Sequence, residues 1–257
     1  MDKASVGGAV LAIAGIVAGL LIEGGDVGQI LQTTAALIVF GGTMGAVLLQ
    51  FPLTTVWDAF RSLGHVFAAP RKEDTHLIRQ MIGFANKARR QGVVSLDADL
   101  AAIRDPFLKQ TLMLAVDGTE PTDLRKIMRV SLDSMTEDEE RLPAVFESAG
   151  GFSPTIGILG AVLGLIQVMQ HLDNIAEVGR GIAVAFVATI YGVGIANPFF
   201  LPFAGKMRLR IRSGHRRREM VLEGVISILE GMNPRMLEIK LAGFVDDADR
   251  NDMERAA

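Results

Sequence analysis

Few residues in this 257-residue sequence could do chemistry. Cysteine is absent, which excludes disulfides, thiolate metal sites and cysteine nucleophiles. The histidines are far apart and lack the spacing of metal ligands, and no phosphate-binding glycine loop or dinucleotide fingerprint is present. The four histidines are His65, His76, His171 and His215. We therefore expect no catalytic residues, no metal site and no cofactor, which argues against a soluble enzyme.

The polar residues that stand out lie inside long uncharged stretches. They are Thr33, Thr34, Thr43, Thr155, Thr189, Tyr191 and Asn197. No Asp, Glu, Lys, Arg or His accompanies them at the same depth, although proton relays inside membranes almost always use an ionisable residue. Threonine hydroxyls also often bond back to their own helix, and this alternative stays open. If the protein handles ions, a partner must supply the carboxylate.

The uncharged stretches are long enough to cross a bilayer. A hydrocarbon core of ~30 Å requires about 20 apolar residues in a helix, whereas soluble core helices rarely exceed about 14 uncharged residues. The first stretch lacks the basic start and cleavage site of a signal peptide, so we interpret it as a retained helix. The predicted transmembrane helices cover about 4–22, 30–51, 152–172 and 181–204.

The distribution of basic residues predicts the orientation of these helices. Of the 26 Lys and Arg residues, all but Lys3 and Arg180 lie between the second and third stretches or after the fourth. Because Lys and Arg favour the cytoplasmic side, both termini and the long middle segment are predicted to be cytoplasmic. In a chain without eukaryotic targeting features, this pattern favours a multi-pass protein of a bacterial inner membrane.

The segments outside the membrane are predicted to be helical. Residues 75–90 have apolar side chains at helical spacing, and Gly92 follows as a C-terminal cap. Asp105 and Pro106 are typical of a helix start, and Asp117-Gly118 of a turn. From about Pro121 to Ser148, a stalk is expected to run into the third span.

After the fourth span, Lys206–Arg218 predicts a basic helix that is followed by an amphipathic segment to about Leu229. Residues 246–257 are polar and are expected to be frayed. The predicted fold is an all-α membrane protein with four transmembrane helices, a helical cytoplasmic domain between helices 2 and 3, and a cytoplasmic C-terminal tail. The predicted domains are 1–52, 53–150, 151–205 and 206–257, in that order.

Small residues and prolines mark the spans. Glycines four residues apart, at 15 and 19 and at 160 and 164, allow helix backbones to approach closely, either within one subunit or against a partner helix. Pro154 is placed at the start of the third span, where proline is tolerated. Pro198 and Pro202, late in the fourth span, predict a kink or hinge.

Together these features resemble the MotA/PomA family, the A subunits of the bacterial flagellar stator. The resemblance covers nearly the whole chain and rests on four segments. They are "AGIVAGLLIEGGDVGQILQTTAALIVFGGTMGAVLLQFP", "ARRQGVVSLD", "SPTIGILGAVLGLI" and "AFVATIYGVGIANPFFLPFAGKM".

The resemblance implies a mechanism. Five A subunits form a ring around the transmembrane helices of two MotB-type B subunits, and an aspartate of the B helix binds the permeating ion. Ion flow turns the homo-pentamer, which pushes the rotor protein FliG. No cofactor is implied besides the permeating ion, and a net charge of −3 gives no indication of nucleic-acid binding.

The resemblance also assigns roles to single residues of the spans. Pro154 and Pro202 match prolines that couple ion flow to torque, whereas Pro198 has no counterpart. Thr189 matches a threonine near the B-subunit aspartate. Ala161 stands where sodium-driven members tend to have threonine, and since hard cations prefer oxygen ligands, alanine favours protons.

Three charged residues match those that face FliG in the family: Arg89, Arg90 and Asp97. Arg89 and Asp97 match the family's basic and acidic residues, although Asp replaces the usual Glu and Arg90 adds a second positive charge. Exposed charge pairs contribute only about 0–1 kcal/mol each, which suits a contact that breaks repeatedly.

The nearest alternative is an ExbB/TolQ-like proton-channel subunit that energises outer-membrane processes. Those proteins usually have three spans, with one before the cytoplasmic domain, so the two-span hairpin at residues 4–51 argues against them. A transporter or membrane enzyme would need polar sites within the spans or a catalytic constellation, and the sequence has neither.

Overall fold

The structure is a computed structural model that describes residues 3–66 and 74–245. Over these residues it is nearly all helical and contains no strand, as expected for the predicted fold class. The chain forms two compact units, each drawn from two separate stretches. We call residues 1–69 with 139–209 the membrane unit, and residues 70–138 with 210–257 the charged unit. The predicted frayed tail lies outside the described residues.

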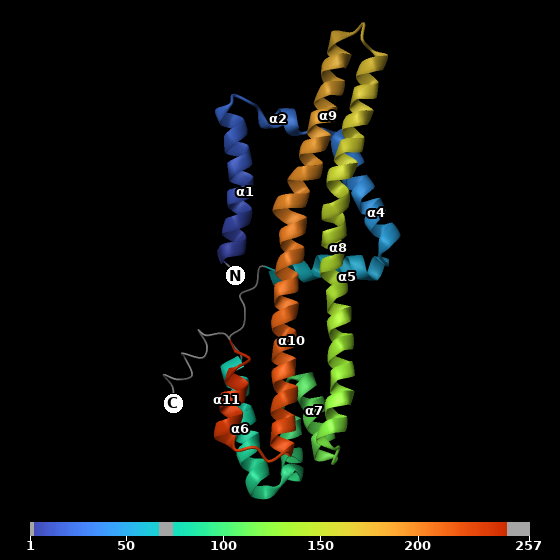
Figure 1. Cartoon of the computed structure of the whole chain (residues 1–257). Coiled ribbons are helices and arrows are strands. Elements are labelled where there is room, and N and C mark those ends of the chain that lie inside the picture. Colours follow the sequence, from blue (N-terminus) through green and yellow to red (C-terminus); the bar gives the residue numbers. More distant parts are fainter. Residues whose placement is uncertain (1–2, 67–73, 246–257) are drawn as a thin grey trace. The chain divides into compact units, whose positions relative to one another are not determined.

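Four helices are long and apolar enough to cross a membrane, as predicted. The first is α1 (Lys3–Ile22), and the second joins α3 (Thr33–Ala36), the π-helix η1 (Leu37–Gly41) and α4 (Gly42–Gln50). The third is part of α8 (Pro121–Gln170), and the fourth joins α9 (Ile175–Ile195), the π-helix η3 (Ala196–Phe200) and α10 (Leu201–Leu229). The short α2 (Val27–Ile30) precedes the second span (Figure 1).

Two span boundaries differ from the predicted ones. The second span begins at Thr33 rather than at residue 30, because the chain leaves the helical conformation between α2 and α3. The helix that carries the fourth span begins at Ile175, before the predicted span start at residue 181, because the side chain of Asn174 accepts a hydrogen bond from the backbone N–H of Ala176 and caps the helix. The predicted boundary followed the last charge, Arg180, but this charge lies within the first two turns of α9.

Pro154 was predicted at the start of the third span, where proline would be tolerated, and the structure places it inside a helix. It is an interior residue of α8, as is Pro143. The predicted stalk from Pro121 runs into the third span without a break. A proline inside a helix has no N–H to donate to the carbonyl four residues earlier, so Pro154 leaves the carbonyl of Gly150 without its usual helical partner.

The membrane unit has an aromatic core that the sequence analysis did not anticipate. It includes Phe146 of α8, which is 1% exposed and packs edge-on against Phe60 and Phe203 at 5.4 and 6.2 Å between ring centroids. Phe60 belongs to α5 (Leu53–Val66), an unpredicted helix that also buries Val56 and Ala59 in this core. The opposite face of α5 exposes Trp57, whose ring lies under the guanidinium of Arg61.

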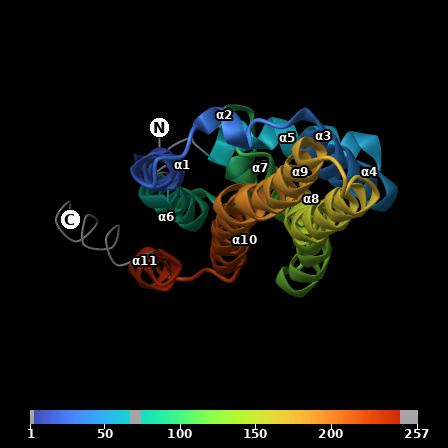
Figure 2. The same cartoon turned by 90° about the horizontal axis from the view of Figure 1, so that it is seen from above.

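Helix α1 takes no part in the cores of the membrane unit. None of its 20 residues is buried. Its main contacts are with α2 and η3, and it stands apart from α8 and α9 (Figure 2). The side chain of Ser5, near its start, accepts a hydrogen bond from Lys206.

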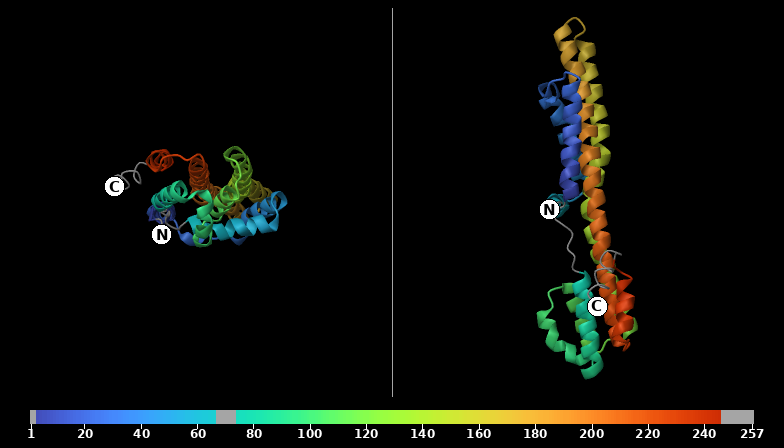
Figure 3. Two further views of the ribbon diagram at one scale, coloured as in Figure 1. Left: turned by 90° about the horizontal axis from the view of Figure 1, so that it is seen from below. Right: turned by 90° about the vertical axis from the view of Figure 1, so that its left-hand side faces the viewer.

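The charged unit is a helical domain around a buried apolar core. Its other helices are α6 (Asp74–Gln91), the 3-10 helix η2 (Val93–Ala102), α7 (Pro106–Val116) and α11 (Pro234–Ala242). The ends of α8 and α10 complete it, and α11 packs beside α6 (Figures 1 and 3). Its largest fully buried side chains include Ile78, Met81, Leu96, Leu108, Leu112, Leu124, Met128, Ile226 and Leu237.

Local signals in this unit agree with the structure. Residues 75–90 lie in α6, and the glycine that ends it, Gly92, has a φ of +84°, a conformation that glycine adopts without strain. The carboxylate of Asp105 accepts hydrogen bonds from the N–H groups of Phe107 and Leu108 at 3.0 and 3.1 Å, and so caps α7.

A cluster of charges ties α8, α10 and α11 together within the charged unit. Glu223 of α10 accepts hydrogen bonds from Arg125 of α8 and, at 2.9 Å, from Lys240 of α11. Burial by itself raises the pKa of Glu223, but these two hydrogen-bond donors outweigh burial and hold that pKa below its ordinary value. The carboxylate is therefore a charged link between three helices.

Candidate functional site

The third and fourth spans pack against each other through small residues of both helices. A Cβ atom on Gly157 would lie 2.8 Å from the carbonyl oxygen of Ala188, and one on Gly164 would lie 2.7 Å from that of Gly181. Such distances are too short for real side chains, so only glycine allows α8 and α9 to approach this closely. The glycines of the third span therefore pack within one subunit. On α1, by contrast, a Cβ at Gly15 or Gly19 would meet nothing within 4 Å.

Pro154 also belongs to this contact between α8 and α9. A Cβ on Gly192 of α9 would lie 3.2 Å from the Cα of Pro154 and even closer to the carbonyl oxygen of Ser153. The hydroxyl of Ser153 is buried and, among the described residues, lacks a hydrogen-bond partner. We did not single out Ser153 from the sequence, because its burial depends on the approach of α9.

Ala161 and Thr189 lie at the same level of the helix pair. A Cβ on Gly160 would lie 2.7 Å from the Cβ of Ala188, and Ala161 and Thr189 are the next residues on the two helices. Both are half-buried. The Thr189 hydroxyl donates to the carbonyl of Ala185 at 3.2 Å, so in this structure it bonds back to its own helix.

The other faces of α8 and α9 are uncovered in the single chain. Thr155 of α8 and Asn197 of η3, which follows α9, are exposed and also bond back to their own helices, at 2.7 and 3.2 Å. The large apolar side chains that remain exposed include Ile158, Leu159, Val162 and Ile166 on α8 and Phe186, Ile190 and Val193 on α9. These faces are apolar enough to lie against lipid or against another apolar helix.

The hydrogen-bond pattern of the fourth span changes where the sequence predicts a kink. Pro198 lies within the π-helix η3, and Pro202 is the second residue of α10 and is exposed. A π-helical turn inside an α-helix is a common cause of bending. Pro154 and Pro202 thus lie on different helices: Pro154 is inside α8, and Pro202 is in the first turn of α10.

Tyr191 of α9 binds the backbone just before the second span. Its hydroxyl donates to the carbonyl of Ile30 and accepts the N–H of Gln32 at 3.2 Å. These two hydrogen bonds engage the backbone of Ile30, where α2 ends, and of Gln32, the residue before α3. The Tyr191 hydroxyl therefore links α9 to the segment between α2 and α3.

The three residues predicted to face a rotor lie close together in sequence around one turn of the charged unit. Arg89 and Arg90 are in the last turn of α6, and Asp97 is in η2. All three are exposed, and within the described part of the chain their side chains make no hydrogen bond or ion pair. They are therefore available to an outside partner.

The α6–η2 turn is held by another charged pair. Lys87 and Asp99 form an ion pair at 2.7 Å between α6 and η2. The sequence analysis did not single out this pair, although it lies beside the predicted contact residues. The pair links the two elements that carry Arg89, Arg90 and Asp97.

Comparison with known proteins agrees with this geometry. Residues 6–92 match the family model of the motility protein A N-terminal region, and residues 99–220 match that of the MotA/TolQ/ExbB proton channel family. Motility protein A of Bacillus subtilis is 35% identical over 252 residues, covering 97% of this chain and 93% of that protein. Chemotaxis protein PomA of Vibrio alginolyticus is 28% identical, covering 97% and 98%.

Solved structures show the same similarity over the whole chain. The Bacillus subtilis flagellar MotAB stator complex matches with a TM-score of 0.89 at 34% identity, covering 98% of this chain and 99% of that chain. The C. jejuni MotAB structure matches with a TM-score of 0.89 at 30% identity, covering 96% and 97%. The chain therefore belongs to the MotA/PomA family of motility A proteins, within the MotA/TolQ/ExbB proton channel family.

Proposed function

We propose that the protein is the stator A subunit of a bacterial flagellar motor, which forms an ion channel with a B subunit and converts ion flow into torque. The observation that carries this function is the similarity over nearly the whole chain to two MotAB stator structures. The motility-specific match over residues 6–92 favours this function over an ExbB/TolQ-like one.

The B subunit supplies the group that this chain lacks. The spans carry hydroxyls and amides but no carboxylate at membrane depth, and a proton pathway needs an ionisable residue. The uncovered faces of α8, α9 and η3 offer apolar side chains with Thr155 and Asn197 among them. A B-subunit helix bearing an aspartate would lie against these faces, and five copies of the chain would surround two such helices.

The permeating ion in this proposal is the proton. Ala161 adds no side-chain oxygen beside Thr189. A sodium ion would need several oxygen ligands to replace its hydration shell. No cofactor takes part besides the ion, and Pro154 and Pro202 couple ion passage to movement of the helices.

The rotor contact in this proposal is made by Arg89, Arg90 and Asp97 with charged residues of FliG. Their exposure, and the ion pair between α6 and η2 beside them, support this role. The contact requires that the charged unit be cytoplasmic, with both termini on the same side of the inner membrane, as the basic-residue pattern predicts.

A motility assay tests the proposed function and the ion together. Swimming speed is measured in a strain whose only stator genes are this one and its B partner, with and without sodium at fixed pH, and with a protonophore in parallel. We expect speed to be independent of sodium and to vanish with the protonophore. Speed that follows sodium would refute the ion assignment and keep the stator. Unchanged motility after deletion of the gene would refute the stator function and favour an ExbB/TolQ-like one.

A further inference from the structure

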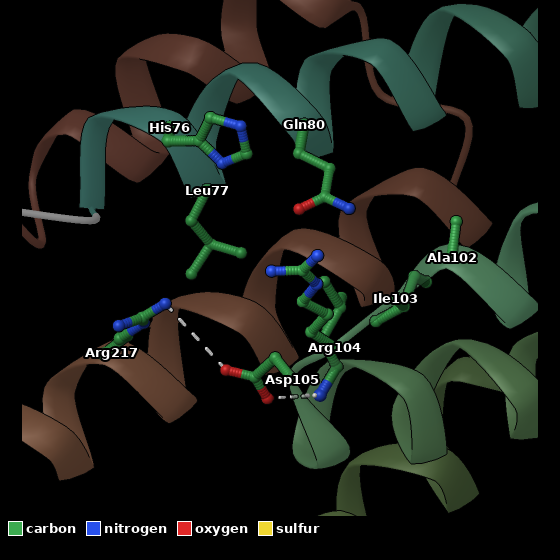
Figure 4. Close-up of a pocket in the computed structure, with 9 residues that line it drawn as sticks. His76, Leu77, Gln80, Ala102, Ile103, Arg104, Asp105 and Arg217 are labelled. Atoms are coloured by element: carbon green, nitrogen blue, oxygen red, sulfur yellow. Dashed lines mark hydrogen bonds and ion pairs between the residues drawn. The ribbon is translucent and has the colours of Figure 1, made fainter.

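The charged unit contains a hollow that none of the roles above uses. It has a volume of about 580 Å³ and lies between α6, the segment that joins η2 to α7, and α10 (Figure 4). All its lining residues belong to the charged unit. Arg89, Arg90 and Asp97 do not line it.

Three polar side chains around this hollow have no partner within the protein. Arg104, His76 and Gln80 line it, and over the described ranges their side chains make no hydrogen bond or ion pair. Arg104 lies between Gln80 and Asp105 (Figure 4). Arg104 and His76 are exposed and Gln80 is half-buried, so a guanidinium, an imidazole and an amide offer N–H groups to one hollow that is open to solvent.

A second guanidinium, that of Arg217, completes the lining from α10. Two of its nitrogens form ion pairs within the unit, at 3.8 Å to a carboxylate oxygen of Asp74 and at 4.0 Å to one of Asp105. Asp105 is the one lining carboxylate, and it is already engaged by two N–H groups at the start of α7. The lining therefore carries more positive than negative charge.

These groups fit a phosphate. Guanidinium groups bind phosphate oxygens through paired N–H donors, and such charge-assisted hydrogen bonds are short and strong. Leu77, Ile103 and Leu108 add an apolar wall, and the volume lies within the range of about 300–1,000 Å³ for small-molecule sites. We propose that this hollow binds the phosphate group of a small molecule, which is either a soluble phosphorylated compound or a phospholipid headgroup.

Occupancy would connect three elements of the charged unit. Arg104 lies in the segment directly after η2, His76 and Gln80 are on α6, and Arg217 is on α10. An anion bound to all of them holds the end of η2 against both helices. Because η2 also carries Asp97, the site is placed to act on the surface that the proposed function assigns to the rotor contact.

The experiment is a calorimetric titration of the purified full-length A–B complex in detergent with pyrophosphate as the probe, in chloride buffer. We expect saturable binding that Arg104→Ala weakens about tenfold or more, since a lost hydrogen bond to a charged group costs about 1.5–3 kcal/mol. Arg129→Ala is the matched control, because Arg129 is exposed in the same unit and does not line the hollow. Circular dichroism of both variants checks the fold.

Parallel titrations with ATP and with short-chain phosphatidylglycerol distinguish the two sources of the phosphate, since the tighter ligand identifies the class. Absence of pyrophosphate binding to the wild-type complex would overturn the proposal. Equal affinities of the wild type and of both variants would overturn it as well. The titration requires neither ion conduction nor rotor contact, so its failure leaves the stator function untouched.

Discussion

The close approach of α8 and α9 predicts a large effect of one added methyl group. In Gly192→Ala, the new Cβ would lie 3.1 Å from the Cα of Gly157, 3.2 Å from that of Pro154 and closer still to the carbonyl oxygen of Ser153. All three contacts are with backbone, so no side-chain rotation relieves them and the helices must move apart. Overpacking of this kind typically costs about 1–3 kcal/mol.

Gly194→Ala is the matched control for this change. Gly194 is in the same helix two residues later, and a Cβ there meets nothing within 4 Å. Both changes gain the same helix propensity of about 1 kcal/mol, so their difference isolates the contact. We expect Gly192→Ala to melt about 2–12 °C below Gly194→Ala, as measured on the purified A–B complex.

The same substitution also tests the role of Pro154. Separation of the helices moves Pro154 away from α9, so swimming speed should fall in Gly192→Ala even where immunoblots show normal amounts of protein in the membrane. Gly194→Ala should swim normally. A Gly192→Ala complex that melts at or above the control would refute the packing argument.

Three further changes test other parts of the structure. Glu223→Gln should lower the free energy of unfolding by about 1–3 kcal/mol at pH 7. Because the pKa of Glu223 is lowered in the folded protein, the wild type should lose this advantage as pH falls from the ordinary glutamate pKa through the folded one. A difference in melting temperature between the two proteins that stays constant over a series of pH values would contradict this. Asp97→Lys should reduce swimming without reducing membrane abundance, whereas Asp133→Lys, at another exposed position of the charged unit, should not; equal motility of the two variants would argue against the rotor contact. Phe146→Ala should destabilise the membrane unit by about 3–5 kcal/mol, since the ring is 1% exposed, and an unchanged melting temperature of the purified protein would count against this core.

The sequence predicts those features that depend on neighbouring residues. Helix α6, its glycine stop and the capped start of α7 follow from local signals, and the four spans follow from length and lack of charge. The resemblance to the MotA/PomA family rests on the same spans and is confirmed by the comparisons. The ion-pathway and rotor-contact residues stay predictions.

The features that sequence reasoning missed depend on distant partners. Pro154 lies inside α8 because apolar and charged residues on both sides continue one helix, so the proline tells little about where the helix begins. The face of α5 that is buried is identified only by its contact with Phe146, which lies far away in the sequence. The hollow around Arg104 joins residues more than a hundred positions apart, and no local pattern brings Arg217 to it.

The lack of burial in α1 has a consequence for the membrane around the protein. Its 20 residues span about 30 Å at 1.5 Å per residue, which equals an average hydrocarbon thickness. Because no residue of this helix is buried within the subunit, its tilt depends on the lipid and on the neighbouring chains that cover it. A thinner bilayer would tilt α1 while Ser5 stays tied to Lys206, so lipid composition would reach the rest of the subunit through the two ends of this one helix.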